Sequence, residues 1–148
     1  MSTEEPHAKP EVVMLTDAGI VELLKTSRRI AVVGASSNPA RPSFGVFRTL
    51  VAAGYECIPV NPNETQVAGV PAVATLAEAV RSGPIDIVDV FRRPELTPEI
   101  AREAVSIGAR ALWLQLGVVN WESARIAAEA GLAVVMDRCT AIEVRRVP

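Results

Sequence analysis

The stretch RIAVVGASSNPARPS, residues 29–43, predicts a buried strand, a tight loop and the start of a helix. Positions 30–33 are all apolar, which is typical of a strand that is covered on both faces. Gly34 allows a sharp turn after the strand, and Ser43 is predicted to cap a helix that ends at Gly54. The stretch is therefore the first strand–loop–helix unit of an α/β fold.

The same unit recurs along the rest of the chain. Further apolar runs predict strands at 56–60, 86–91, 111–115 and 132–136, with a weaker candidate at 70–73 that contains Pro71. Helices are predicted to begin at Thr16, at Thr97 with Pro98 in the first helical position, and at Asn120, and the last two to end at Gly108 and Gly131. This alternation favours a Rossmann-like, doubly wound α/β fold: a mostly parallel sheet of five to six strands with helices on both faces. Residues 15–148 are predicted to form a single domain, preceded by an N-terminal tail at 1–14.

Composition limits the classes of protein that the chain can represent. The sequence has 148 residues, 49% of them hydrophobic, and a formal net charge of −2, so a core can form without disulfides or metal. The near-neutral net charge does not indicate the positively charged surface that binding to nucleic acid requires. No apolar run is long enough for a membrane span, and the acidic start does not resemble a secretory signal, which favours a cytoplasmic protein.

Histidine and cysteine exclude further classes. The single histidine, His7, lies in the predicted tail, so the domain lacks the imidazole that Ser-His-Asp and Cys-His catalysis, phosphohistidine chemistry and His-rich zinc sites require. Cys57 and Cys139 are far apart in sequence and are interpreted as two separate thiols. We expect no catalytic residue and no metal site.

The loops that follow the strands are the expected ligand site, because open parallel sheets bind ligands outside the carboxyl ends of their strands. In the first loop, Gly34 is followed by the amides and hydroxyls of Ser36 and Ser37 and then by a helix, whose positive dipole end suits a phosphate. The loop lacks the G-x-G-x-x-G pattern, since Ser36 and Pro39 replace the second and third glycines. A differently shaped phosphate site and a plain connecting loop both stay open at this point.

The end of the second strand carries Asn61, where an NAD site usually has an acidic residue for the ribose. Arg41, Arg92 and Arg93 could add positive charge nearby, which suits a nucleotide with an extra ribose phosphate, such as NADP or coenzyme A (CoA). The alternative for these arginines is a solvated surface. Asp89, inside an apolar strand, is expected to accept hydrogen bonds from loop amides or to pair with Arg138 or another arginine.

Three long segments carry a family resemblance: IAVVGASSNPARPSFGVFRTLVAAGYECIPVNP, DIVDVFRRPE and ALWLQLGVVNWESARIAAEAGLAVVMDRC. They resemble the small stand-alone CoA-binding domain proteins of bacteria and archaea. More distantly, they are similar to the N-terminal CoA-binding domain of the succinyl-CoA synthetase alpha subunit. The resemblance spans roughly residues 16–146, nearly the whole chain.

The resemblance implies that CoA or an acyl-CoA lies across the strand ends of a Rossmann-like fold. It implies contacts from four groups of residues: Gly34, Ala35, Ser36 and Ser37 with Arg41 at the phosphates; Asn61 and Pro62 in the second loop; Phe91, Arg92 and Arg93 after the strand at 86–91; and Gln115, Leu116 and Gly117 near the pantetheine arm. Ligase activity is not implied, because the phosphorylated histidine of the large ligases lies on a different domain.

We therefore expect a CoA- or acyl-CoA-binding protein that acts as a non-catalytic carrier, sensor or regulatory module. One alternative is an NAD(P)-binding oxidoreductase-like protein, and another is a partner-binding subunit with a vestigial nucleotide pocket. The expected partner is a small-molecule nucleotide, with neither nucleic acid nor membrane. A homo-oligomer or a protein partner stays open, as does the reactivity of Cys57 and Cys139.

Overall fold

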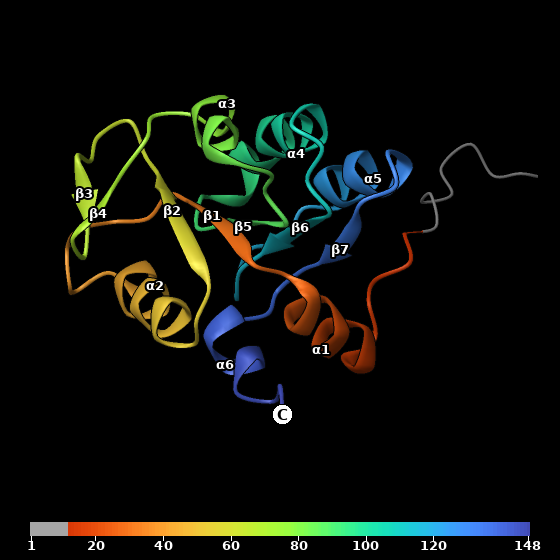
Figure 1. Cartoon of the computed structure of the whole chain (residues 1–148). Coiled ribbons are helices and arrows are strands. Elements are labelled where there is room, and N and C mark those ends of the chain that lie inside the picture. Colours follow the sequence, from red (N-terminus) through yellow and green to blue (C-terminus); the bar gives the residue numbers. More distant parts are fainter. Residues whose placement is uncertain (1–11) are drawn as a thin grey trace, which may run out of the picture.

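Five parallel strands form the central sheet in the computed structural model, which describes residues 12–148 (Figure 1). In spatial order the strands are β2 (Glu56–Val60), β1 (Arg29–Val33), β5 (Ile87–Val90), β6 (Ala111–Leu114) and β7 (Ala133–Val135). His7 and most of the predicted tail lie outside the described residues. The sheet confirms the predicted fold class with five strands.

The strand order changes direction between β1 and β5. From β1 the chain first adds β2 on one side, and it then returns to add β5, β6 and β7 on the other side. Val33, at the end of β1, is in register with Val60 of β2 and with Val90 of β5, so these three strands end level with one another. This is the switch point of a doubly wound, Rossmann-like sheet, at which such folds bind their ligands.

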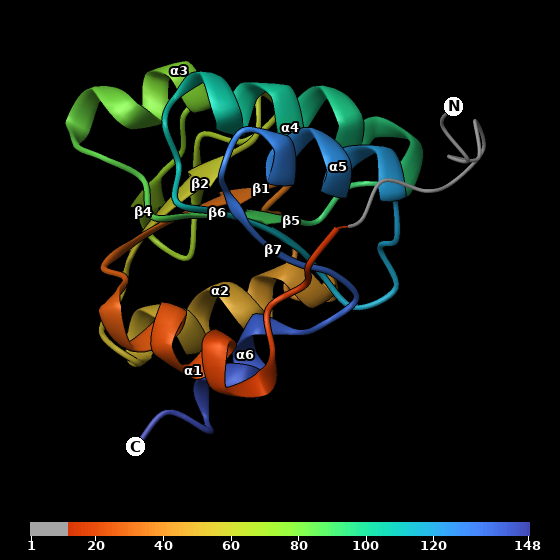
Figure 2. The same cartoon turned by 90° about the vertical axis from the view of Figure 1, so that its right-hand side faces the viewer.

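Helices cover both faces of the sheet (Figure 2). One layer holds α1 (Asp17–Thr26), α2 (Pro42–Ala52) and α6 (Thr140–Val144), and the other holds α3 (Leu76–Ala79), α4 (Thr97–Ser106) and α5 (Trp121–Glu129). Two 3-10 turns, η1 (Val80–Ser82) and η2 (Pro94–Leu96), follow α3 and precede α4. Within residues 12–148, no helix combines the length and the apolar character that crossing a membrane would need.

Each strand buries alternate side chains in the two layers. In β1, Ile30 and Val32 pack with the α1, α2 and α6 layer, whereas Ala31 and Val33 pack with the α3, α4 and α5 layer. Trp113 of β6 is fully buried, and its Nε1 donates a hydrogen bond of 2.8 Å to the carbonyl of Arg138. The continuous apolar runs of the sequence thus serve two cores rather than one.

Two of the predicted helix caps are wrong by a short distance. Arg41, not Ser43, is the N-cap of α2, because Pro42 occupies the first helical position, where its missing N–H costs nothing. Leu96, not Thr97, is the N-cap of α4, since the 3-10 turn η2 leads directly into this helix. The caps at Thr16 and Asn120 are confirmed by side-chain hydrogen bonds to the first turns of their helices.

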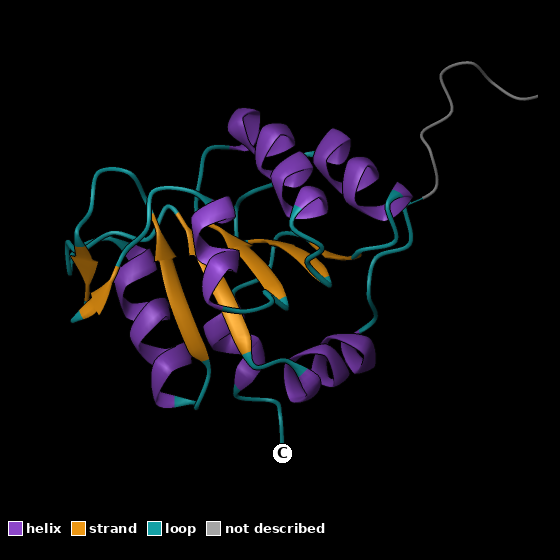
Figure 3. Cartoon of the chain, turned by 45° about the horizontal axis from the view of Figure 1, so that its top comes forward, coloured by secondary structure: helices purple, strands orange, loops and turns teal. Residues whose placement is uncertain are grey.

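The predicted strand at 70–73 is not part of the main sheet. β3 (Gln66–Val67) and β4 (Val70–Pro71) instead form a small antiparallel pair beside it, and Val73 makes one isolated parallel bridge with Val60 (Figure 3). Pro71 has no N–H for a ladder, and Ala68 and Gly69 turn the chain with positive φ angles, so the segment closes on itself. The short helices α3 and α6 were not predicted from the sequence.

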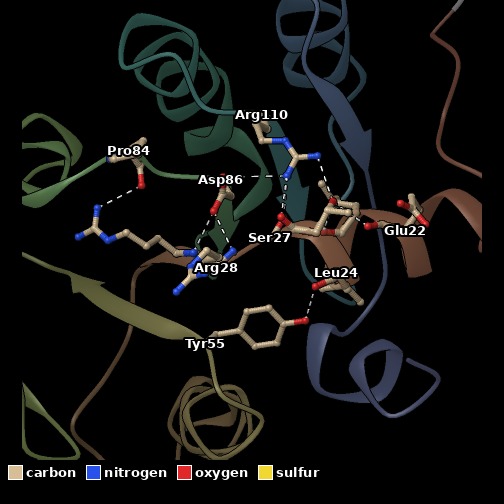
Figure 4. Close-up of polar contacts among 11 residues, drawn as sticks. Glu22, Leu24, Ser27, Arg28, Tyr55, Pro84, Asp86 and Arg110 are labelled. Atoms are coloured by element: carbon tan, nitrogen blue, oxygen red, sulfur yellow. Dashed lines mark hydrogen bonds and ion pairs between the residues drawn. The ribbon is translucent and has the colours of Figure 1, made fainter. Parts of the chain in front are cut away.

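The end of the sheet opposite the strand carboxyl ends is held by polar contacts (Figure 4). The carboxylate of Asp86 accepts hydrogen bonds from the backbone N–H groups of Arg28 (2.8 Å) and Arg29 (3.0 Å). The hydroxyl of Tyr55 donates a 2.6 Å hydrogen bond to the carbonyl of Leu24. These contacts join the starts of β1 and β5 to each other and the start of β2 to α1.

Candidate ligand-binding site

A cavity of about 660 Å³ lies at the carboxyl ends of the strands, at the switch point. Its volume falls within the range of small-molecule and cofactor sites. Its walls come from the ends of β1, β2, β5 and β6 and from the starts of α2 and α6. The lining residues are Gly34, Ser36, Arg41, Pro42, Ser43, Val46, Asn61, Asn63, Phe91, Arg92, Gln115, Leu116, Val118, Cys139 and Ile142.

The cavity brings together most of the residues that the sequence singled out. Those that line it are Gly34, Ser36, Arg41, Asn61, Phe91, Arg92, Gln115 and Leu116. Those that do not line it are Ala35, Ser37, Pro62, Arg93 and Gly117. Ala35 is fully buried in the layer of α1, α2 and α6, and the N–H of Gly117 donates to Asp137 at 2.7 Å.

Gly34, which follows β1, lies directly against Phe91, which follows β5. Its φ is +86°, and a Cβ there would overlap the carbonyl of Phe91 and crowd the side chain of Arg92. Its N–H donates to the carbonyl of Val60 at 2.9 Å. Only glycine combines a positive φ with the close approach of the Phe91 carbonyl. Through these contacts Gly34 connects the ends of β1, β2 and β5 at the cavity.

The loop after β1 uses its polar groups largely within itself. The N–H of Ser36 donates to the hydroxyl of Ser43 at 3.1 Å, and the hydroxyl of Ser36 accepts from the N–H of Asn38 at 3.0 Å. The N–H of Ala40 donates to Oδ1 of Asn38 at 2.9 Å. The Ser36 amide is therefore used within the loop rather than aimed at a ligand, whereas the Ser36 hydroxyl accepts from Asn38 and keeps its own hydrogen to donate at the cavity.

Ser37 makes an anion contact, but with an acid of the chain itself. Its N–H donates to Oε2 of Glu64 at 2.8 Å, and this hydrogen bond lowers the pKa of the Glu64 carboxyl. Glu64 follows β2 and lies just before β3. Glu64 was not found from the sequence, since nothing in its spacing indicates that the second strand-end loop folds back onto the first.

Asn61 connects two loops through its carboxamide. Its Nδ2 donates to the carbonyl of Ala35 at 2.9 Å, and its Oδ1 accepts from the N–H of Asn63 at 2.9 Å. A carboxylate could not make the first of these contacts, because it has no hydrogen to donate. The amide that departs from the NAD pattern therefore has a structural role at the cavity wall.

The cavity is electropositive. None of its lining residues is acidic. Arg41 and Arg92 are exposed and have no ion-pair partner among the described residues. The first turn of α2 adds the positive end of a helix dipole. Within residues 12–148, no group of three or more His, Cys, Asp or Glu side chains is arranged to hold a metal ion.

A buried polar triad lies beneath the β6 side of the cavity. Asp89 is fully buried; its Oδ1 accepts from Nε2 of Gln115 at 2.6 Å, and its Oδ2 accepts from the hydroxyl of Thr140 at 3.0 Å. Burial raises the pKa of Asp89 to about 7. The expected partners, loop amides or Arg138, are wrong: α6 brings Thr140 over the strand, while Arg138 pairs with Asp17 at 2.8 Å.

The cavity lining also contains apolar side chains. They are Val46, Leu116, Val118 and Ile142, together with Cys139, and Leu116 is 65% exposed. Cys139 is partly buried, whereas Cys57 is buried in the core and burial raises its pKa to about 12. The two thiols do not pair, as predicted, and only Cys139 lines the cavity.

A doubly wound α/β domain with an electropositive cavity at its switch point belongs to the broad class of nucleotide-binding folds. The family is defined by sequence: the family model described as "CoA binding domain" matches residues 28–145. The chain belongs to this CoA-binding domain family, which confirms the resemblance found in the sequence.

Individual relatives have similar lengths and folds. The chain is 48% identical to the uncharacterized protein YneT of Bacillus subtilis over 122 residues, which cover 82% of this chain and 89% of YneT. A hypothetical protein from Pyrococcus horikoshii is 37% identical, with a TM-score of 0.85 over 90% of this chain and 92% of the other. The protein ID.343 from Thermus thermophilus is 36% identical, with a TM-score of 0.83 over 89% and 98%.

Proposed function

We propose that this protein binds CoA or an acyl-CoA in the cavity at the switch point. The observation that carries the proposal is the mixed chemistry of the cavity lining. Arg41, Arg92 and the start of α2 supply positive charge, and Val46, Leu116, Val118 and Ile142 supply apolar surface. CoA combines the same two characters, with charged phosphates at one end and a neutral pantetheine arm at the other.

The positive charge of the cavity lining suits phosphates for two reasons. Unpaired arginines bind phosphate oxygens through several N–H groups at once, and a helix N-terminus favours a negative charge. Asn61 takes the place of the acid that would repel a ribose phosphate. These features favour a ligand such as CoA, which carries an additional ribose phosphate, over NAD.

The role that we propose is that of a non-catalytic carrier, sensor or regulatory module in the cytoplasm. The only histidine of the sequence, His7, precedes the family domain, and the site contains no pair of groups set up as nucleophile and base. Membership in a family defined by CoA binding supports the ligand; the carrier, sensor or regulatory role goes beyond that support.

Calorimetric titration of the full chain with CoA, dephospho-CoA, NAD and NADP tests the ligand. We expect CoA to bind most tightly and NAD most weakly. Absence of CoA binding at millimolar concentration would overturn the proposal. Tighter binding of NADP than of CoA would favour the oxidoreductase-like alternative, and a folded protein that binds none of the four would favour the partner-binding subunit.

A further inference from the structure

The triad of Asp89, Gln115 and Thr140 reaches the cavity through Gln115 and has a feature that phosphate binding does not explain. Gln115 is 3% exposed, and it also lines the cavity. Its Nε2 donates to Asp89 at 2.6 Å and to the hydroxyl of Thr140 at 2.8 Å. Its Oε1 has no hydrogen-bond partner among the described residues.

Counting hydrogens shows which end of the Gln115 carboxamide faces the triad. Three contacts connect the three side chains, so three hydrogens are needed. With Nε2 inward, the amide supplies two and the hydroxyl of Thr140 supplies the third to ionised Asp89. With Oε1 inward, even a protonated Asp89 leaves two hydrogens for three contacts, and one pair of oxygens would meet with none between them.

The orientation does not depend on the charge of Asp89. When Asp89 is protonated on Oδ2, its Oδ1 still accepts from Nε2 of Gln115, and the Oδ2 proton can be donated to Thr140. The triad therefore holds Oε1 on the outer side in both protonation states. Oε1 accepts no hydrogen bond from the described residues, yet it is not one of their fully buried polar atoms that lack a partner. It therefore has some exposed surface, and this surface lies at the cavity.

We propose that Gln115 is a specificity-determining residue, whose Oε1 accepts a hydrogen bond from an N–H or O–H group of the neutral arm of the ligand. Asp89 and Thr140 are positioning residues that act through Gln115. This inference rests on the proposed function, because it takes the amide-bearing pantetheine arm of CoA to lie beside Gln115. An apolar wall with one fixed acceptor is how such pockets orient a ligand that is mostly neutral.

The test compares CoA with its two halves, 4′-phosphopantetheine and adenosine 3′,5′-bisphosphate, on wild type and on Gln115→Met. Methionine keeps the length of the side chain and removes the acceptor. We expect CoA and 4′-phosphopantetheine to bind about five- to tenfold more weakly to the variant, the effect of one lost hydrogen bond. Adenosine 3′,5′-bisphosphate should bind wild type and variant equally.

Equal affinity of CoA for wild type and Gln115→Met, or an equal loss for all three ligands, would overturn the inference. Failure of wild type itself to bind CoA would instead overturn the proposed function. If Gln115→Met does not fold, Thr140→Val and Thr140→Ser decide. A loss of CoA affinity in Thr140→Val that Thr140→Ser restores supports the positioning role, whereas unchanged affinity in Thr140→Val contradicts it.

Discussion

The carbonyl of Phe91 lies so close to Gly34 that no Cβ fits between them. Gly34→Ala should therefore lower the free energy of unfolding by at least about 2 kcal/mol, since alanine adds both a collision and a strained positive φ. Gly45→Ala is the matched control, because a Cβ on Gly45 in α2 meets nothing within 4 Å. It should raise stability by about 0.5–1 kcal/mol. Equal urea midpoints for the two variants would contradict this account of Gly34.

Arg41 is expected to contact a phosphate of the ligand. Arg41→Glu should weaken CoA binding at least about tenfold, because a repulsive charge replaces an attractive one at the cavity. Calorimetry with dephospho-CoA then identifies the phosphate: a smaller loss for dephospho-CoA assigns Arg41 to the 3′-phosphate, and an equal loss assigns it to the pyrophosphate. Arg48→Glu is the control, since Arg48 lies on α2 over the ring of Phe44 and does not line the cavity. A similar loss in both variants would show only a general charge effect.

Glu64 is expected to compete with the ligand for the first loop. Its carboxylate takes up the N–H of Ser37 and adds a negative charge beside the loop that carries Arg41. Glu64→Gln should therefore bind CoA several-fold more tightly than wild type in calorimetry. Glu22→Gln makes the same charge change on α1 and should leave the affinity unchanged. Weaker binding by Glu64→Gln would mean that this carboxylate supports the loop rather than opposing the ligand.

Asp89 should make stability depend on pH. Burial raises its pKa from 3.8 to about 7, so the folded chain retains this proton over a range in which the unfolded chain has lost it. The stability that this proton adds to the folded state is fully present below about pH 4 and is lost as the pH rises to about 7. The unfolding free energy of Asp89→Asn minus that of wild type should therefore rise across this window, by up to about 4 kcal/mol, and stay level above it.

Urea titrations of both proteins at several pH values measure this difference. The subtraction removes the titrations that the two proteins share. A difference that does not vary with pH would show that Asp89 is ionised throughout the range.

The two thiols should react at very different rates. Cys57 is buried and its pKa is raised to about 12, whereas Cys139 lines the cavity. Iodoacetamide at pH 8, followed by peptide mass spectrometry, should modify Cys139 at least tenfold faster, because the thiolate is the reactive form. Saturating acetyl-CoA, which has no free thiol to consume the reagent, should slow the reaction of Cys139 and leave that of Cys57 unchanged. Equal protection of both thiols would indicate general stabilisation rather than occupation of the cavity.

Much of the fold followed from the sequence because its signals are local. An apolar run such as that at 111–115 predicts a buried strand by itself, and Asn120 caps its helix through a residue only three positions away. Gly34 and Asn61 could be placed at the site because each follows a strand, and the ends of parallel strands meet at one edge.

The parts that could not be predicted depend on contacts between distant segments. Glu64 reaches Ser37 across 27 positions, and Thr140 reaches Asp89 across 51. α6 has only five residues, too few for a periodic pattern to be recognised. The N-cap of α4 was also predicted at the wrong residue, since the place where α4 begins depends on the 3-10 turn before it rather than on Thr97 itself.

The walls of the cavity are drawn from positions as far apart as Gly34 and Ile142. A ligand that contacts both of these residues would act as a non-covalent crosslink between the first and last thirds of the chain. Unfolding either part would then require release of the ligand, so occupancy should raise the melting temperature of the whole domain as one cooperative unit. Turnover of the protein in the cell would then follow the supply of its ligand.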